Sequence, residues 1–291
     1  LNAQHKGGFT PFEADVPALL QPGETALLTV ACDNRVNHST LPVGNEDGQL
    51  AFFGSDNADI PSVEAAKRAA APQNRPNFDF FNYAGIHRPV VLYTTPKEYI
   101  EDVTIVPAVD GTVQYAVKTT GSAPVHVMVL DADGNAVASA EGTEGTITIP
   151  EVHLWEPRPG TPYLYTLHIT CGADVYDQTF GVRSIEVRGT QVLLNGKPLY
   201  FKGFCKHEDF TAHGRGFDPV LNVKDVNLIH WANANAVRTS HYPQSPYFLD
   251  ECDRRGLLVF TELPGWQHIG DDNWKDAACV MVRERLLQIR S

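Results

Sequence analysis

Three different patterns of apolar and polar residues follow one another along the chain, over residues 1–96, 97–183 and 184–291. In the middle stretch, short runs of alternating apolar and polar residues recur about every ten residues and are separated by polar turns. The runs that predict strands are 104–106, 113–117, 125–130, 146–149 and 164–169. This spacing is typical of an immunoglobulin-like β-sandwich.

The last stretch combines strands with helices. Asn195-Gly196 between two apolar runs is a strong hairpin signal. Beyond it, Asp218-Pro219 and Ser245-Pro246 predict helix starts, and a third helix is expected from about Asn273 onward. The strands expected between these helices are 201–204, 236–240 and 257–260. Continuous apolar strands that alternate with helices indicate a parallel sheet, and three such units match the opening of an eight-unit TIM barrel.

Residues 1–96 are expected to be β structure with long loops. The apolar runs Ala26–Cys32 and Val90–Tyr93 predict strands there, and an aromatic cluster from Phe78 to Tyr83 precedes the second run. The sequence begins at Leu1 inside an expected strand and has no signal peptide. We therefore expect the chain to be a segment of a longer protein.

Composition and charge exclude several classes of protein. Hydrophobic residues make up 43% and charged residues 20%, which indicates a globular chain. The formal net charge of −12 argues against a nucleic-acid partner, because phosphate contacts need a surplus of Lys and Arg. Apolar stretches stay below the roughly 20 residues of a membrane span, and the five cysteines are scattered. A cytoplasmic enzyme without a membrane partner fits these features best.

Polar and aromatic side chains follow each expected strand of the last stretch. They are Lys206-His207-Glu208-Asp209 after the first strand, Arg238, His241 and Tyr242 after the second, and Glu262, Trp266 and His268 after the third. In barrels these positions meet at one face, where the working residues lie. Acidic groups with aromatic rings suit a sugar, although the rim of a barrel is polar in any case.

Other chemistries fit the sequence less well. His207, His213 and His241 suggest a zinc site, yet their spacing matches no standard one. Ser240-His241 is not part of a G-x-S-x-G motif, and no phosphate-binding or dinucleotide loop is present. We therefore predict neither a metal nor a cofactor. Glu208 and Glu262 could form the carboxylate pair of a retaining glycosidase, or each could instead orient a neighbouring Arg or His.

A long motif lies around the second of these strands. It runs Asn235-Ala236-Val237-Arg238-Thr239-Ser240-His241-Tyr242-Pro243, then Phe248-Leu249, Asp253, and Gly256 followed by Leu257-Leu258-Val259-Phe260. This pattern resembles the first signature of glycoside hydrolase family two, with every fixed position filled. Other segments resemble the β-glucuronidase branch of that family: 8–13, 79–88, 92–96 and 206–209. The likeness covers essentially the whole chain.

The resemblance implies a fold and an activity. Residues 1–96 would be the C-terminal part of a sugar-binding jelly roll, 97–183 the sandwich, and 184–291 the start of a catalytic barrel. The complete enzyme would be a retaining β-glucuronidase that hydrolyses β-D-glucuronides, as a homo-oligomer. The residues that would serve the sugar site are Asp79 on the hydroxyls, His207 in the pocket wall, Arg238 and His241 beside the catalytic carboxylates, and Glu208, Tyr242 and Glu262 behind them.

The catalytic glutamates of the family have no counterpart in this sequence. By the resemblance, the acid/base Glu follows an Asn at the end of the fourth barrel strand, and the nucleophile comes later. Neither is found after Glu262, and Asn45-Glu46 in the first stretch matches neither. We therefore expect both glutamates to lie beyond Ser291, so that this chain alone would be inactive.

A second departure concerns the substrate. Residues 264–271 are similar to a segment of β-galactosidase-like members of the family. One alternative is therefore such a member. The other alternative, from a different class, is a non-catalytic carbohydrate-binding or assembly fragment.

Overall fold

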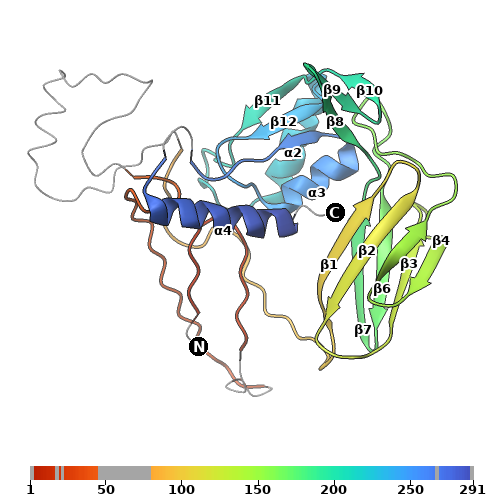
Figure 1. The fold of residues 1–291 in the computed structure, drawn as a ribbon. Coiled ribbons are helices and arrows are strands. Elements are labelled where there is room, and N and C mark those ends of the chain that lie inside the picture. The colour runs from red at the N-terminus through yellow and green to blue at the C-terminus, as the bar shows by residue number, and fades with distance from the viewer. Residues whose placement is uncertain (1–2, 17–19, 21–22, 45–79, 266–268, 289–291) are drawn as a thin grey trace, which may run out of the picture.

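The computed structural model describes residues 3–16, 20, 23–44, 80–265 and 269–288 (Figure 1). Among these residues, regular secondary structure begins at Ile100, and the elements before residue 200 are all strands. Helices alternate with strands after that point. None of the helices in the described part of the chain combines the length and the apolar character that a membrane span requires.

The middle of the chain folds into two antiparallel sheets. One has the order β1-β2-β5 and the other β4-β3-β6-β7. Their bounds are β1 Ile100–Pro107, β2 Thr112–Thr119, β3 Val125–Leu130, β4 Ala136–Glu141, β5 Glu144–Thr148, β6 Tyr165–Cys171 and β7 Asp174–Phe180. Alternate side chains of the strands meet in one core, in which Val113, Val127 and Leu167 are fully buried. The predicted immunoglobulin-like sandwich is confirmed.

Two strands of the sandwich were not predicted. β4 and β7 lie at the two edges of the larger sheet, and no other strand among the described residues pairs with their outer sides. Edge strands need fewer large apolar residues: β4 is rich in Ala, and β7 carries Asp174 and Asp177. The pattern of apolar positions is therefore weakest at these edges.

A meander of three short strands leads out of the sandwich. It consists of β8 Ile185–Arg188, β9 Gln191–Leu194 and β10 Lys197–Leu199 in the order β10-β9-β8. The predicted turn between the last two strands is present. Asn195 and Gly196 both have positive φ angles, of 50° and 75°, as a two-residue hairpin turn requires.

A parallel sheet with helices follows. Strands β11 Gly203–Lys206, β12 Ala236–Thr239 and β13 Leu258–Phe260 lie side by side in that order. Helices α2 Pro219–Trp231, α3 Pro246–Arg255 and α4 Asp272–Gln288 follow them in turn. The predicted helix signals are confirmed: Asp218 accepts hydrogen bonds from the amides of the first turn of α2 at 2.9 and 3.1 Å. Ser245 begins α3, and Gly256 ends it in the left-handed conformation.

The helices do not all cover the sheet. Helices α2 and α3 pack together on it through a core that includes Val226, Phe248 and Cys252. Helix α4 lies instead against the described part of residues 1–96, which we call the N-terminal stretch. There Glu284 accepts a 2.6 Å hydrogen bond from Thr10, and the buried Met281 lies close to Gly7. The third helix therefore contacts the start of the chain.

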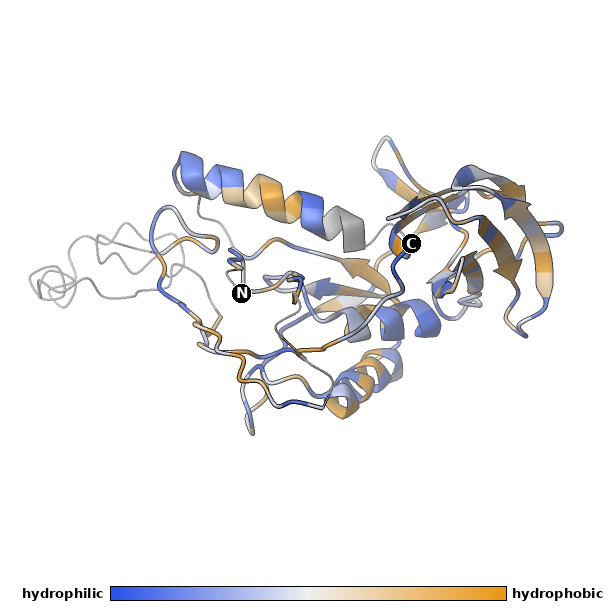
Figure 2. Cartoon of the chain, turned by 90° about the horizontal axis from the view of Figure 1, so that it is seen from below, coloured by the Kyte–Doolittle hydropathy of each residue, from blue (hydrophilic) through white to orange (hydrophobic). Residues whose placement is uncertain are grey.

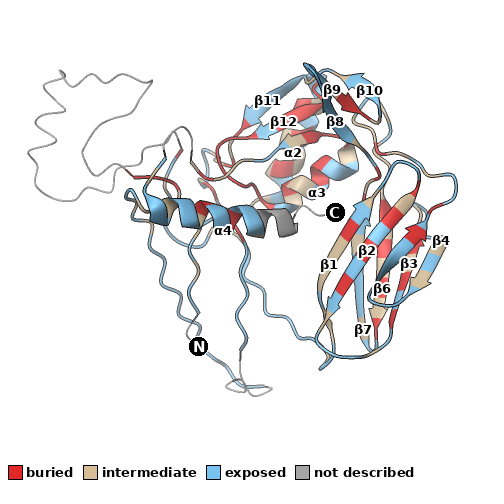
Figure 3. Cartoon of the chain, in the orientation of Figure 1, coloured by how far each residue is buried: buried red, intermediate tan, exposed pale blue. Residues whose placement is uncertain are grey.

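The two strands expected in residues 1–96 are not formed. Residues 26–32 and 90–93 pair with no other strand of the described part of the chain. Their apolar side chains are exposed, with Leu27 at 93% and Leu92 at 72%. In Figure 3 the coil before β1 is largely pale blue, the colour of exposed residues, and Figure 2 colours parts of it orange for hydrophobic residues. A strand exists only where a neighbour pairs with its backbone groups, and an apolar pattern alone does not supply that neighbour.

Trp155 joins the sandwich to the parallel sheet. Its ring is 3% exposed and packs with Ala236 and Leu258, at the first residues of β12 and β13. Its Nε1 donates a 2.8 Å hydrogen bond to the carbonyl of Asp253 in α3. The sandwich therefore supports the sheet at the end where its strands begin, opposite to the end where they stop.

We expect Trp155→Ala to weaken this junction. Removing a buried Trp lowers the free energy of unfolding by about 3–5 kcal/mol. Trp231 at the end of α2 is 86% exposed, so Trp231→Ala should change it by less than about 0.5 kcal/mol. Denaturant titrations followed by circular dichroism compare the two variants. Equal effects would show that Trp155 does not hold the junction.

Candidate functional site

The C-terminal ends of the three parallel strands bring together four of the predicted residues. Arg238 of β12 lies level with Cys205 of β11 and Phe260 of β13. His241 and Glu262 come shortly after β12 and β13. His207, after β11, places its ring 5.6 Å from that of His241, edge to face. We call Arg238, His241, Glu262 and His207 the strand-end cluster.

Glu262 is the centre of this cluster. One of its oxygens accepts a hydrogen bond from Nε of Arg238, and the other lies 2.9 Å from Nδ1 of His241. Its backbone amide donates to the hydroxyl of Thr239 at 3.3 Å. The hydrogen bond to Glu262 raises the pKa of Arg238 above its ordinary value. Glu262 therefore holds a permanent cation and an imidazole in fixed positions, while Arg238 stays 45% exposed.

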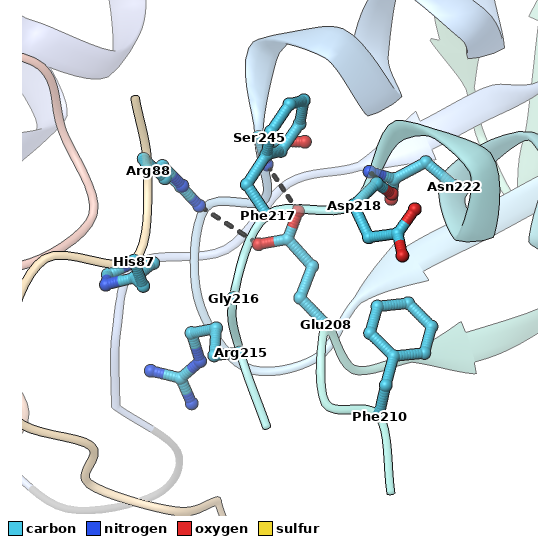
Figure 4. A pocket seen from close by; sticks show the side chains of 10 residues that line it. All are labelled: His87, Arg88, Glu208, Phe210, Arg215, Gly216, Phe217, Asp218, Asn222 and Ser245. Carbon is cyan, nitrogen blue, oxygen red and sulfur yellow. Dashed lines mark hydrogen bonds and ion pairs between the residues drawn. The ribbon is translucent and has the colours of Figure 1, made fainter. Parts of the chain in front are cut away.

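Glu208 has a different environment from Glu262. It is 7% exposed, and its two oxygens accept hydrogen bonds from Arg88 at 3.1 Å and from the amide of Ser245 at 2.7 Å (Figure 4). Arg88 also donates to the carbonyls of Phe9 and Pro243, at 2.6 and 2.7 Å. Glu208 thus lies in the wall of a small cavity and binds the N-terminal stretch to the loops after the strands.

Tyr242 is fully buried beside Glu208. Its hydroxyl accepts a 2.8 Å hydrogen bond from the backbone amide of Glu208. Its ring stacks on Phe9 at 4.8 Å and meets Phe80 at 5.0 Å. Burial raises the pKa of Tyr242 to about 12. The phenol is therefore neutral at physiological pH, and it fixes the positions of its neighbours.

Some of the sequence-based candidates cannot be placed. Asp79, Trp266 and His268 fall outside the described residues. Ser291, beyond which the sequence predicts the catalytic glutamates, also lies outside them, because the described part of the chain ends at residue 288. The roles given to Asp79 and to glutamates after Ser291 therefore stay predictions.

Two further candidates point away from the strand-end cluster. Lys206 turns back into the fold, where its Nζ is 3.2 Å from Asp225. His213 lies 3.5 Å from Asp218 at the start of α2. In the part of the chain that the structure describes, no three His, Cys, Asp or Glu residues are grouped as metal ligands would be.

Two arginines that contact the predicted residues were not predicted as site residues. Arg88 pairs with Glu208, and Arg215 lies over the ring of Tyr242 at 4.3 Å. Both are brought there by tertiary structure, from segments without a periodic pattern. The only local signal is an Arg between two glycines, Gly214 and Gly216, in the loop after β11.

Two family models match the chain. "Glycosyl hydrolases family 2" matches residues 98–183, and "Glycosyl hydrolases family 2, TIM barrel domain" matches residues 185–280. The chain belongs to glycosyl hydrolase family 2. The sandwich and the parallel sheet with its helices are thus the family's own domains, and the strand-end cluster lies in the TIM-barrel domain.

Several relatives of the chain within this family are β-glucuronidases. The chain is 42% identical over 282 residues to β-glucuronidase of Sus scrofa, a match over 90% of this chain and 41% of that protein. Faecalibacterium prausnitzii β-glucuronidase has a similar structure, with 93% identity and a TM-score of 0.85 over 90% of this chain and 44% of that one. Bifidobacterium dentium β-glucuronidase follows with 43% identity and a TM-score of 0.78, over 88% and 46%. The chain spans less than half the length of these relatives.

We expect His87, in the wall of the small cavity, to make the fold sensitive to acid. Burial, with Arg88 and Arg215 nearby, lowers the pKa of His87 from 6.5 to about 4. As the pH falls through this interval the unfolded chain binds a proton that the folded chain refuses, so stability falls. At about 1.4 kcal/mol per pKa unit, reduced by partial exposure to solvent, His87→Phe should remove of the order of 1–2 kcal/mol of this loss.

Denaturant titrations at pH 7.5 and 4.5 test this expectation. The control is His126→Gln, which replaces an exposed histidine on β3. The free energy of unfolding of the control should fall between the two pH values as that of the wild type does, and that of His87→Phe should fall less. An equal fall in all three proteins would contradict a role of His87.

Proposed function

We propose that the intact protein is a retaining β-glucuronidase and that the strand-end cluster forms part of its sugar site. The observation that carries the proposal is the arrangement of Arg238, His241 and Glu262 at the open end of the sheet. The 93% identity to a β-glucuronidase supports the choice of substrate. The Bifidobacterium dentium enzyme, a more distant relative, is known in complex with coumarin-3-O-glucuronide.

The cluster suits the chemistry of a retaining glycosidase. Such an enzyme protonates the leaving oxygen and attacks the anomeric carbon with a carboxylate. Arg238 presents N–H donors and a positive charge, and His241 presents its ring, beside the place where these carboxyl groups would act. Glu262 keeps both side chains in one orientation. His207 would close the pocket wall on the side of β11.

Several further proposals rest on the family resemblance. The domains would be residues 1–96, a partial jelly roll, 97–183, the sandwich, and 184–291, the first three units of the barrel. Parallel pairing of β11, β12 and β13 supports the last of these. The complete enzyme would act in the cytoplasm as a homo-oligomer, with its acid/base and nucleophile on segments beyond Ser291.

We expect the 291-residue chain alone to hydrolyse no glycoside. Both candidate carboxylates are already engaged: Glu208 by Arg88 and Ser245, and Glu262 by Arg238 and His241. Both oxygens of each carboxylate are occupied by these partners, so neither carboxylate is free to contact the glycosidic oxygen or the anomeric carbon of a substrate. The purified chain, assayed with nitrophenyl glucuronide and nitrophenyl galactoside, should show no turnover above the uncatalysed rate.

The variants Glu208→Gln and Glu262→Gln are the controls for this assay. Robust turnover by the chain that either variant abolishes would make the internal pair catalytic. For the intact protein the same two substrates separate the glucuronidase from a β-galactosidase-like enzyme. Binding of sugars without turnover by the intact protein would favour a carbohydrate-binding module.

We expect Asp79→Ala in the intact protein to impair catalysis while leaving the fold stable. A hydrogen bond between a charged group and a sugar hydroxyl contributes about 1.5–3 kcal/mol. If the bond strengthens in the transition state, its loss lowers kcat/KM by roughly one to two decades. The melting temperature should stay unchanged, and Asp133→Ala, in an exposed turn of the sandwich, is the control. Unchanged kcat/KM would remove Asp79 from the site.

A further inference from the structure

Thr239 ends the middle strand of the parallel sheet, directly before the strand-end cluster. It is the last residue of β12, and it is fully buried. Its hydroxyl makes two hydrogen bonds to the end of the neighbouring strand: it donates to the carbonyl of Phe260 and accepts from the backbone amide of Glu262, both at 3.3 Å. A hydroxyl carries one proton and two lone pairs, so it binds both partners at once.

The hydroxyl continues the sheet where the backbone pairing of the two strands stops. The last paired residues of β12 and β13 are Arg238 and Phe260. Beyond them, the carbonyl of Thr239 accepts a 3.2 Å hydrogen bond from the amide of Tyr242, within its own loop. The side chain of Thr239 then does what a paired strand residue does with its backbone, because it binds one carbonyl and one amide of the neighbouring segment. The backbone of Glu262 is thereby fixed to the end of β12.

The carboxylate of Glu262 serves two partners from one position. One oxygen accepts a hydrogen bond from Nε of Arg238, and the other lies 2.9 Å from Nδ1 of His241. The two partners also contact each other, with Nη2 of Arg238 3.3 Å from the same Nδ1. Charge-assisted hydrogen bonds of this kind depend on geometry, so a displaced backbone at Glu262 would loosen at least one of these contacts.

We propose that Thr239 is a positioning residue for the sugar site and that it acts through its hydroxyl. The hydroxyl sets the place of Glu262, and Glu262 in turn orients Arg238 and His241, the side chains assigned above to the surroundings of the reacting carboxyl groups. This inference rests on the proposed function. Thr239 is fully buried and does not contact the substrate, so its effect on the reaction passes through Glu262.

The first test compares variants at position 239 in the intact protein, with nitrophenyl glucuronide as the substrate. Thr239→Val keeps the shape of the side chain and removes the hydroxyl. Because misplacement of a group in a site by about 1 Å can cost 10²-fold, we expect the partial displacement of Glu262 to lower kcat/KM about 10-fold. Thr239→Ser keeps the hydroxyl and should stay within about twofold of the wild type, although the lost methyl group lowers the melting temperature. Ser240→Ala is the control: the buried hydroxyl of Ser240 has no hydrogen-bond partner among the described residues, so kcat/KM should be unchanged.

A second pair of variants covers the case in which Thr239→Val does not fold. Thr239→Ala and Thr239→Ser differ only in the hydroxyl, and kcat/KM of the alanine variant should be about 10-fold below that of the serine variant. A purely structural Thr239 predicts lower melting temperatures with wild-type kcat/KM per folded molecule in every variant. That result, or equal losses of kcat/KM with and without the hydroxyl, overturns the inference.

A double-mutant cycle with Glu262→Ala shows whether the effect passes through Glu262. Without the carboxylate, the place of the backbone at residue 262 no longer matters to Arg238 and His241. Adding Thr239→Val to Glu262→Ala should therefore cost less than about twofold in kcat/KM, because residues of one network are not additive. An active wild type with losses that multiply overturns only the role of Thr239. An intact wild type without glucuronidase activity overturns the proposed function, and this inference with it.

Discussion

The burial of Tyr242 holds the N-terminal stretch against the parallel sheet. Its hydroxyl accepts a hydrogen bond from the amide of Glu208, and its ring contacts Phe9, Phe80 and the guanidinium of Arg215. Tyr242 follows closely after β12, so its contacts are fixed relative to the sheet. The N-terminal stretch, which forms no sheet of its own in the described residues, is thereby placed at the strand ends, where the candidate site lies.

Arg88 and Arg215, which lie beside Tyr242, restrict the packing of the N-terminal stretch to one arrangement. A buried guanidinium is costly unless its donors and its charge are satisfied. Arg88 balances its charge with Glu208 and donates hydrogen bonds to the carbonyls of Phe9 and Pro243. Arg215 balances its charge with Asp209 at 3.7 Å, donates one hydrogen bond to the carbonyl of Phe81, and lies against the rings of Phe9, Phe80, Tyr83 and Tyr242. A shift of the N-terminal stretch would leave these donors buried without partners. These polar contacts thus define the position of the stretch, and the rings of Phe9, Phe80 and Tyr242 pack beside them.

The parts of the fold that the sequence predicts well are those that depend on local interactions. The caps at Asp218 and Ser245 and the turn at Asn195-Gly196 involve residues within a few positions of one another, and all three are confirmed. The convergence of Arg238, His241 and Glu262 was predictable because parallel strands end at the same edge. The contacts of Arg88 and Arg215 depend on segments more than a hundred residues apart. Residues 26–32 form no strand because no segment of the described part pairs with them, and no local pattern indicates whether such a partner is present.

Glu208 and Glu262 have the same side chain but differ in burial and in the segments that supply their partners. Each follows a strand of the same sheet, and each is bound by an arginine. Glu208 is buried, and its arginine comes from the segment before the sandwich, so its ion pair connects two parts of the fold. Glu262 is more exposed, and its partners, Arg238 and His241, come from the neighbouring strand and the loop after it, so its ion pair organises one edge of the sheet. Because Arg238 stays 45% exposed while Glu262 holds it, its guanidinium faces solvent in one fixed orientation at the end of the sheet where the strands stop.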